Sequence, residues 1–200
     1  LSESPIDENF IVIGTDDGLI QMTENSGKTW RKIDNIPDAP EQSYVNSVYL
    51  SQHDVNVIYV AFNHHKYGDF KPYIFKSSDR GNSWVSISSN LPIRGSVYSI
   101  EEDHVDSNLI FCGTEFGVFF SPDSGGNWKE LANGLPTIAV RDIAIQRREN
   151  DLVLGTFGRG FYVLDDYSVL RSIENSEKDP VAQIFDIRDA LMWEKANPLG

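Results

Sequence analysis

The sequence predicts an all-β protein built from β-propeller blades, which are four-stranded antiparallel sheets arranged around a central channel. A short apolar run that ends in a small residue occurs at 10–15, 57–62, 109–114 and 151–156. The small residues are Gly14, Ala61, Gly113 and Gly155, and successive ones lie 42 to 52 positions apart. Repeats of this length made of strand-like segments are typical of propeller blades, and the apolar residues in them do not follow helical spacing.

Each repeat divides into strand-like segments in a fixed order. The second repeat has segments at 44–50, 56–62, 72–77 and 83–88, and the third at 96–102, 109–114, 117–121 and 127–131. The fourth repeat has three, at 139–145, 151–156 and 160–165, before its pattern fades, and the first repeat lacks an innermost strand. We therefore predict about four blades in an incomplete ring or a fragment of a larger propeller, over 1–36, 44–90, 96–132 and 139–170.

Residues 171–200 are predicted to form a linker or closing strand that leads toward a further domain. The run VAQIF at 181–185 is the candidate for a missing strand. An open arc of blades leaves apolar faces uncovered, so we expect this chain to self-associate when it is isolated.

Three equivalent turns carry the same residue types, TENSGKTW at 23–30, SSDRGNSW at 77–84 and SPDSGGNW at 121–128. We call them the Trp turns. In the second, Asp79 is expected to accept hydrogen bonds within its own turn, Gly81 to take a backbone conformation that a β-carbon opposes, and Trp84 to pack against the neighbouring sheet. This chemistry explains every position, so we interpret the turns as structural: Thr23, Asn25, Gly27 and Trp30; Ser77, Asp79, Gly81 and Trp84; Ser121, Asp123, Gly125 and Trp128.

Composition excludes several kinds of partner. The formal net charge of −13 argues against nucleic acid, because phosphate binding needs a basic face. No apolar run approaches the length of a membrane span, so no such span is predicted. Cys112 is the only cysteine, and the adjacent His64 and His65 diverge in an extended loop, so neither a disulfide nor a metal site is predicted. No motif for a cofactor is found either, and we predict none.

A candidate ligand-binding face is expected where the loops between second and third strands meet the links between blades. The insert NHHKYGDF at 63–70 is longer than its counterparts and is the best single candidate. Surface loops are rich in charge in any protein, so simple solvation is the competing interpretation. The predicted binding residues are His64, His65, Lys66, Tyr67, Asp69, Arg94, Arg141 and Arg159. Weak catalytic candidates on the same rim are Asp16, Asp17, Asp69 and Glu115.

The Trp turns resemble the Asp-box, or bacterial neuraminidase repeat, found in sialidases, sortilin-type receptors and xyloglucan-cleaving endoglucanases. The stretches 134–171 and 63–84 are most similar to bacterial sortilin-like proteins labelled glycosyl hydrolases, with His65 and Asp69–Tyr73 matching a pattern of that group. The segment 183–193 resembles a link from such a propeller to a C-terminal β-sandwich. Phe157 stands where the group usually has a His, and no sialidase or xyloglucanase catalytic set can be placed.

Three functions are compatible with these observations. The first is a binding scaffold that presents its rim of loops to a glycan, peptide or protein. The second is part of a glycoside hydrolase that uses paired carboxylates, one of which would have a raised pKa as a general acid. The third is a purely structural set of blades. The resemblance implies an extracellular or periplasmic location, and whether the chain is an enzyme stays open.

Overall fold

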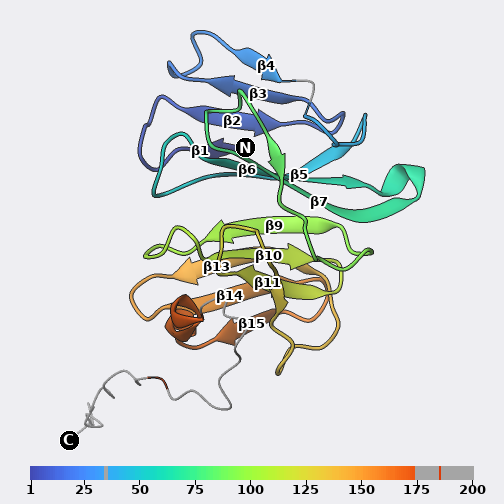
Figure 1. The fold of residues 1–200 in the computed structure, drawn as a ribbon, viewed down its shortest axis with the longest axis vertical. Helices are drawn as coiled ribbons and strands as arrows, with labels where there is room; N and C mark the ends of the chain where they lie inside the picture. Colours follow the sequence, from blue (N-terminus) through green and yellow to red (C-terminus); the bar gives the residue numbers. More distant parts are fainter. Residues whose placement is uncertain (34–35, 174–184, 186–200) are drawn as a thin grey trace, which may run out of the picture.

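The computed structural model describes residues 1–33, 36–173 and 185, and it consists of four antiparallel sheets in chain order (Figure 1). Blade 1 has strands β1 (Ser2–Glu3), β2 (Ile11–Gly14), β3 (Ile20–Thr23) and β4 (Arg31–Ile33). Blade 2 has β5 (Tyr44–Leu50), β6 (Ile58–His64), β7 (Asp69–Ser77) and β8 (Val85–Ser86), with a single 3-10 turn η1 (His65–Tyr67) between β6 and β7.

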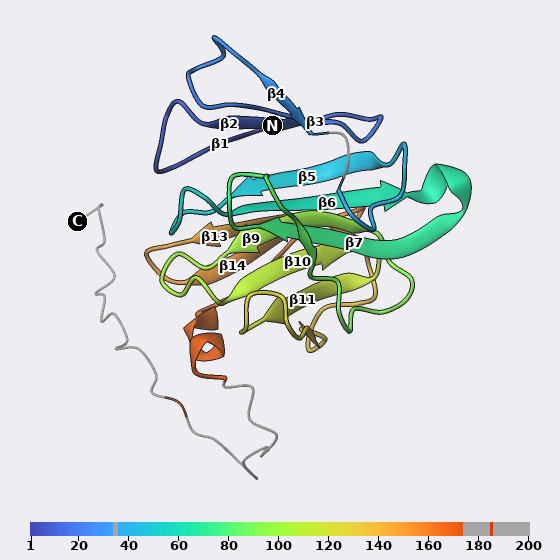
Figure 2. The ribbon, with the colours of Figure 1, turned by 45° about the horizontal axis from the view of Figure 1, so that its top comes forward.

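Blades 3 and 4 continue the same arrangement. Blade 3 has β9 (Val97–Glu102), β10 (Ile110–Thr114), β11 (Gly117–Ser121) and β12 (Lys129–Glu130). Blade 4 has three strands, β13 (Val140–Gln146), β14 (Asp151–Thr156) and β15 (Phe161–Leu164), followed by a 3-10 helix η2 (Tyr167–Ser172). In each sheet the strands lie in sequence order, and the innermost strands β5, β9 and β13 contact one another in succession. Figure 2 shows the blades stacked face to face. The predicted all-β blade architecture and the incomplete ring are confirmed.

The hydrophobic core lies between blades and not within them. Along β6, Ile58, Val60 and Phe62 pack into the cluster shared with blade 1, and the alternating Tyr59 and Ala61 pack into the cluster shared with blade 3. Both faces of a middle strand are therefore buried. This explains why its sequence is a continuous apolar run without polar alternation.

The small residues that end these runs have a steric cause. A Cβ on Gly14 would lie 2.2 Å from Val45 Cγ1, and one on Gly113 would lie 2.6 Å from the Val140 carbonyl oxygen. Both neighbours belong to the innermost strand of the following blade. The repeat of small residues therefore marks the positions where consecutive blades approach most closely.

The three Trp turns have equivalent hydrogen bonds. In the second, Ser77 Oγ accepts from the N–H of Gly81 at 2.7 Å, and Asp79 accepts from the N–H of Ser83 at 2.8 Å and from its hydroxyl at 2.6 Å. The hydrogen bonds from Ser83 hold the pKa of Asp79 at about 2. Thr23 with Asn25, and Ser121 with Asp123, accept from the matching backbone positions.

A second set of equivalent turns, which the sequence analysis missed, joins the first strand to the second in blades 1 to 3. In blade 2, Ser51 Oγ accepts from the N–H of Asp54, and Asp54 accepts from the N–H of Asn56. The Asn56 carbonyl then accepts from the N–H of Arg80 in the Trp turn at 2.9 Å. Blades 1 and 3 repeat the pattern with Ser4, Asp7 and Asn9 and with Asp103, Asp106 and Asn108.

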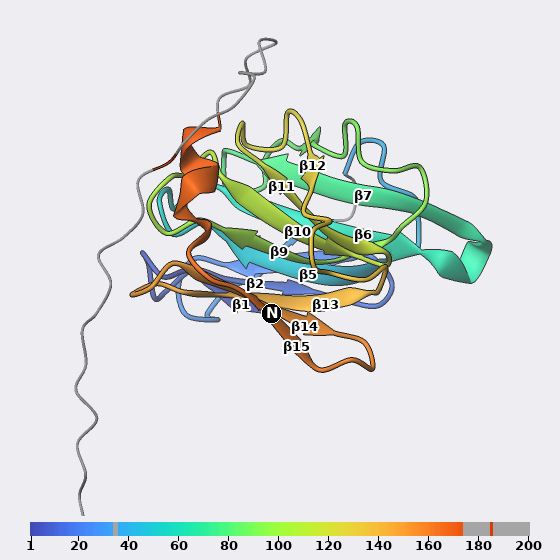
Figure 3. The same ribbon diagram turned by 90° about the horizontal axis from the view of Figure 1, so that it is seen from below.

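Two expectations are corrected. Blade 1 does have an innermost strand, because the two residues of β1 pair with Val12 and Ile11 of β2. The insert at 63–71 is not a loop: strands β6 and β7 extend through most of it and form a hairpin that projects beyond the other blades (Figure 3). Trp84 packs into the cluster shared with blade 1, as predicted, whereas 43% of the surface of its counterpart Trp30 is exposed. Its turn faces away from blade 2, where the described structure has no blade. Except for Phe185, the candidate strand at 181–185 and the rest of the predicted linker beyond 173 lie outside the described residues.

Candidate binding site

Three consecutive innermost strands have a β-bulge at the same place. The pairing register with the second strand skips one residue in each: Asn46 in β5, Tyr98 in β9 and Arg141 in β13. A bulge leaves the extra residue unpaired and turns its side chain in a new direction. These three side chains line the same hollow.

The hollow has a volume of about 500 Å³ and is open to solvent on the rim of the arc. Residues from the ends of the neighbouring strands and from the strand-to-strand turns complete its lining. Besides the bulge residues these are Tyr44, Asn63, His65, Phe70, Ser96 and Glu115. The concave surface thus combines aromatic rings, side-chain amides, one carboxylate and one guanidinium. This composition is expected of a ligand site.

Arg141 supplies the positive charge of the hollow. Its guanidinium carbon lies 3.7 Å from the ring centroid of Tyr98 and 5.4 Å from that of Phe157. Within the described part of the chain, no carboxylate forms an ion pair with it. The rings therefore hold the cation in place and leave its N–H donors available to a ligand.

A line of side-chain amides connects the bulge of blade 2 to blade 3. Asn46 donates to the Val97 carbonyl at 2.5 Å, Asn63 donates to Asn46, and the Asn63 oxygen contacts His65 Nδ1. These contacts fix the orientation of His65 toward the hollow. On the other side, burial raises the pKa of Tyr98, with Arg141 acting against the rise and Glu115 adding to it.

The carboxylates proposed for catalysis do not gather here. Glu115 lines the hollow, but Asp69 accepts from the Tyr73 hydroxyl at 2.7 Å, and that hydrogen bond lowers its pKa. Asp17 accepts from the Thr15 hydroxyl within its own turn, and its pKa is also lowered. Asp16 is exposed beside it and does not line the hollow. The raised pKa expected of a general acid is found at neither Asp17 nor Asp69.

The two adjacent histidines point to different surroundings. His64 stacks on Tyr67 with ring centroids 4.4 Å apart, and its Nδ1 lies 3.3 Å from Ser43 Oγ. The Tyr67 hydroxyl donates to Gln42. His64 and Tyr67 therefore fasten the hairpin to the link between blades 1 and 2, away from His65. Among the described residues, no group of three or more His, Cys, Asp or Glu side chains is placed to hold a metal ion.

The remaining predicted rim residues lie outside the hollow. Lys66 is exposed at the tip of the hairpin, and Arg159 is exposed in the turn between β14 and β15. The Arg94 guanidinium lies 5.8 Å from the ring centroid of Phe70, which itself lines the hollow. Of the predicted binding residues, the structure thus brings His65 and Arg141 together, with Arg94 at the border.

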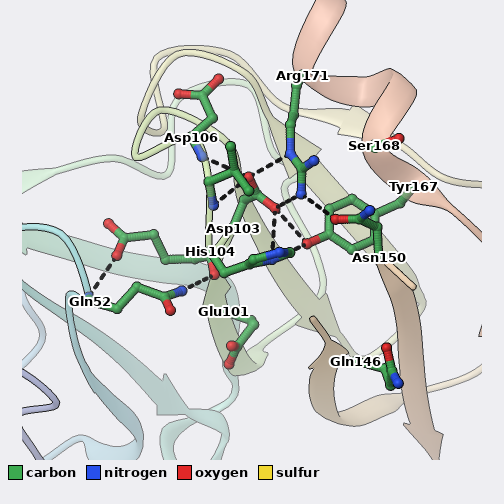
Figure 4. Close-up of polar contacts among 12 residues, drawn as sticks. Gln52, Glu101, Asp103, His104, Asp106, Gln146, Asn150, Tyr167, Ser168 and Arg171 are labelled. Atoms are coloured by element: carbon green, nitrogen blue, oxygen red, sulfur yellow. Dashed lines mark hydrogen bonds and ion pairs between the residues drawn. The ribbon is translucent and has the colours of Figure 1, made fainter. Parts of the chain in front are cut away.

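The opposite end of the blades is fastened by buried polar contacts (Figure 4). Asp103 is fully buried and accepts two hydrogen bonds of 2.8 Å from Arg171 and one from the Tyr167 hydroxyl. Burial raises the pKa of Asp103, but the hydrogen bonds from Arg171 and Tyr167 outweigh it and hold the value at about 2. These contacts anchor η2 to blade 3, and burial raises the pKa of the nearby Glu101 to about 7.

Sequence reasoning found Arg141 but missed the other two bulge residues. The signal was present, because the three innermost strands read Val-Asn-Ser, Val-Tyr-Ser and Val-Arg-Asp at equivalent positions. Only the charged member stood out as a candidate, since a single Asn or Tyr within a predicted strand does not by itself indicate a bulge.

Comparisons with known proteins identify the fold. No family model matches the chain, and no curated protein matches it. A GH74 enzyme from Niastella koreensis superposes with a TM-score of 0.65 at 18% identity, over 82% of this chain and 27% of that one. An ancestral GH74 enzyme gives 0.62 at 22% identity, over 78% and 21%. YCF48 bound to D1 peptide gives 0.61 at 19% identity, over 82% and 50%.

The structural superpositions establish the β-propeller fold. The low sequence identities leave the activity open. The chain spans between about a fifth and a half of the length of these three structures. Both glycoside hydrolases and a peptide-binding propeller are among these proteins. In addition, no helix in the described part of the chain is long and apolar enough to cross a membrane.

Proposed function

We propose that this chain is a binding module, and that its ligand is an extended peptide with an acidic group seated on Arg141. The observation that carries the proposal is the convergence of three bulge residues in one hollow. The same β-bulge in three blades places an amide, a phenol and a guanidinium side by side. A repeated backbone feature thus produces a shared binding site.

The charge of the hollow favours an acidic group in the ligand. The chain as a whole has a net charge of −13, yet the cation of Arg141 is held over aromatic rings and is not neutralised by a described carboxylate. A carboxylate that reaches it would form charge-assisted hydrogen bonds. Tyr44, Phe70 and Tyr98 supply apolar surface for the rest of the ligand.

Similarity to YCF48 supports a peptide, since that propeller is solved with a peptide bound. Similarity to GH74 enzymes supports the alternative of a glycoside hydrolase. The peptide is favoured because Glu115 is the only carboxylate among the described residues of the hollow, and hydrolysis of a glycoside needs two carboxyl groups about 5 to 10 Å apart.

We further propose that the propeller is of the Asp-box type and belongs to the sortilin-like group, and that the protein lies outside the cell or in the periplasm. The hydrogen bonds of the Trp turns support the first assignment. The resemblance of 63–84 and 134–171 to sortilin-like sequences supports the others.

The test is calorimetric titration of acidic, neutral and basic peptides and of neutral oligosaccharides of glucose and xylose. We expect acidic peptides to bind, and Arg141→Ala to weaken them by about 10- to 100-fold, because a hydrogen bond to a charged group contributes about 1.5–3 kcal/mol. The control is Arg148→Ala, which removes the same charge from an exposed residue in the β13–β14 turn.

Equal losses in the two variants would show unspecific attraction and contradict the proposal. If the chain releases sugar from an oligosaccharide and Glu115→Gln abolishes that release, the chain is a hydrolase and not a binding module. If neutral oligosaccharides bind and Arg141→Ala does not weaken them, the ligand is a glycan and not a peptide.

A further inference from the structure

The line of side-chain amides beside the hollow has a fixed direction. It begins at the Val97 carbonyl of blade 3, which can only accept a hydrogen bond. The atom of Asn46 that lies 2.5 Å from this carbonyl must therefore be the amide nitrogen, which leaves the Asn46 oxygen on the other side. Asn63 donates its own amide nitrogen to that oxygen. One backbone carbonyl thus sets the orientation of two side-chain amides.

This direction fixes the position of the proton on a neutral His65. The amide oxygen of Asn63 faces His65 Nδ1 and can only accept, so Nδ1 has to be the protonated ring nitrogen. A neutral imidazole has a single N–H, and Nε2 is then an acceptor. Among the described residues no group donates to this nitrogen, and His65 lines the hollow. The amide line therefore leaves an acceptor available to a ligand.

The hollow thus combines hydrogen-bond donors with acceptors. Arg141 supplies N–H donors, while His65 Nε2 and the Glu115 carboxylate are acceptors. The amide oxygens of Asn46 and Asn63 are already engaged within the line. A fully ionised anion such as sulfate has no proton to give to these acceptors. The combination indicates a ligand that carries an N–H or O–H group as well as its acidic group.

We propose that His65 is a specificity-determining residue, and that its Nε2 accepts a hydrogen bond from a backbone N–H of the peptide whose acidic group binds Arg141. This inference rests on the proposed function and names a second group by which the peptide is recognised.

A peptide backbone suits this acceptor. An extended peptide presents N–H groups along its whole length, and each one needs a partner when it is removed from water. The neutral imidazole matches such a neutral donor, whereas the Glu115 carboxylate would favour a cationic group. Asn46 and Asn63 act through His65 by holding its tautomer, so they are positioning residues.

The first measurement determines the tautomer and needs no ligand. The nitrogen NMR chemical shifts of an imidazole ring distinguish a protonated from an unprotonated nitrogen. At about pH 8, where an ordinary imidazole is neutral, we expect the proton of His65 on Nδ1. Asn46→Ala should increase the form protonated on Nε2, because the Asn63 amide is then free to rotate and to present its nitrogen to the ring.

The matched control for this measurement is Asn90→Ala. Asn90 also joins blade 2 to blade 3, since its amide donates to the Trp128 carbonyl at 3.0 Å and accepts from the Trp128 N–H at 2.7 Å, but it does not line the hollow. It should leave the tautomer of His65 unchanged. A proton on Nε2 in the unaltered chain would overturn the proposal. So would an equal shift in both variants, because the tautomer would then respond to separation of the blades.

The second measurement tests the ligand. An acidic peptide that binds in the calorimetric titration is prepared with one backbone amide at a time N-methylated, which replaces the N–H donor with a methyl group. We expect one of these peptides to bind about 3- to 10-fold more weakly, as the loss of one neutral hydrogen bond predicts. In His65→Phe, which keeps an aromatic ring without its nitrogens, the same N-methylation should cause no further loss.

His64→Phe is the control, because it makes the same replacement at the adjacent residue, whose ring stacks on Tyr67 outside the hollow. It should leave the effect of N-methylation as it is in the unaltered chain. An effect that disappears in Glu115→Gln and persists in His65→Phe would assign the N–H to the carboxylate and overturn the proposal. If no acidic peptide binds, the proposed function and this inference both fail. If peptides bind but N-methylation acts equally with and without His65, only this inference fails.

Discussion

The same Trp turn occurs in two different surroundings. In blade 3 it is buried against blade 2, and in blade 1 it lies on a face that no described blade covers. Trp128 is 4% exposed and donates from its ring nitrogen to blade 2, whereas Trp30 is 43% exposed. A Cβ on Gly125 would lie 2.8 Å from Ile87, while one on Gly27 would meet only Trp30 of its own turn, at 3.8 Å. The turn chemistry is therefore local, but the energy that the turn contributes depends on the blade beside it.

Polar contacts add to the difference. At the interface of blades 2 and 3, the buried Glu102 accepts from the Ser51 hydroxyl at 2.7 Å and from the N–H of Gln52 at 2.9 Å. Both partners belong to blade 2. Carboxylates placed in this way bind two blades together, because leaving one unpaired in the interior is costly. Blades are therefore stabilised in pairs and not singly.

The largest expected effect is at the closed interface. Trp128→Ala should lower the free energy of unfolding by about 3–5 kcal/mol, because it opens a cavity and leaves the Ile87 carbonyl without its partner. Trp30→Ala removes the same side chain from the open face and should cost less than about 1 kcal/mol. Denaturant titration of both variants measures the difference. Similar losses would show that Trp30 is covered in solution, for example by self-association.

The glycines of the same turns give a smaller and sharper contrast. Gly125 and Gly27 have φ angles of 93° and 84°, so an Ala pays a similar backbone strain at either position. Only Gly125→Ala also pushes its methyl group into Ile87. We expect Gly125→Ala to be more destabilising than Gly27→Ala by about 1–3 kcal/mol. A difference near zero in thermal unfolding would mean that the two blades separate at little cost.

The last expected effect depends on pH. Glu101 receives a hydrogen bond from Tyr49 of blade 2 at 3.5 Å, and burial raises its pKa from an ordinary 4.5 to about 7. Because the folded chain holds this proton more tightly than the unfolded chain, stability decreases as the pH rises through this window. Glu101→Gln should remove that part of the dependence and gain up to about 3 kcal/mol over the unaltered chain at pH 8, with no gain at pH 4, because each pKa unit corresponds to about 1.4 kcal/mol. Denaturant titration at pH 4 and pH 8 measures the stability difference between the variant and the unaltered chain. An equal difference at the two pH values would contradict the shifted pKa.

Much of the fold could be predicted because its signals are local or recur. The Trp turns depend on hydrogen bonds within one repeat. The small residue at the end of each second strand and the two-sided apolar runs are caused by packing between blades, but they recur at a regular spacing and can therefore be recognised in the sequence. Even so, the two-residue β1 and the second set of turns at Ser4, Ser51 and Asp103 escaped notice, because so short a strand and scattered Ser, Asp and Asn residues have no distinctive pattern in one sequence.

The amino-acid sequence by itself determined the blades, their order and the chemistry of their turns, since these follow from strand periodicity and from hydrogen bonds between residues a few positions apart. Only the tertiary structure decided which residues meet. Asn46, Tyr98 and Arg141 are far apart in the chain, and they line one hollow because a bulge recurs at the same register in three stacked sheets. Likewise, Trp30 and Trp128 differ only in whether a blade lies against them. Such differences depend on contacts between distant segments, and local sequence does not contain them.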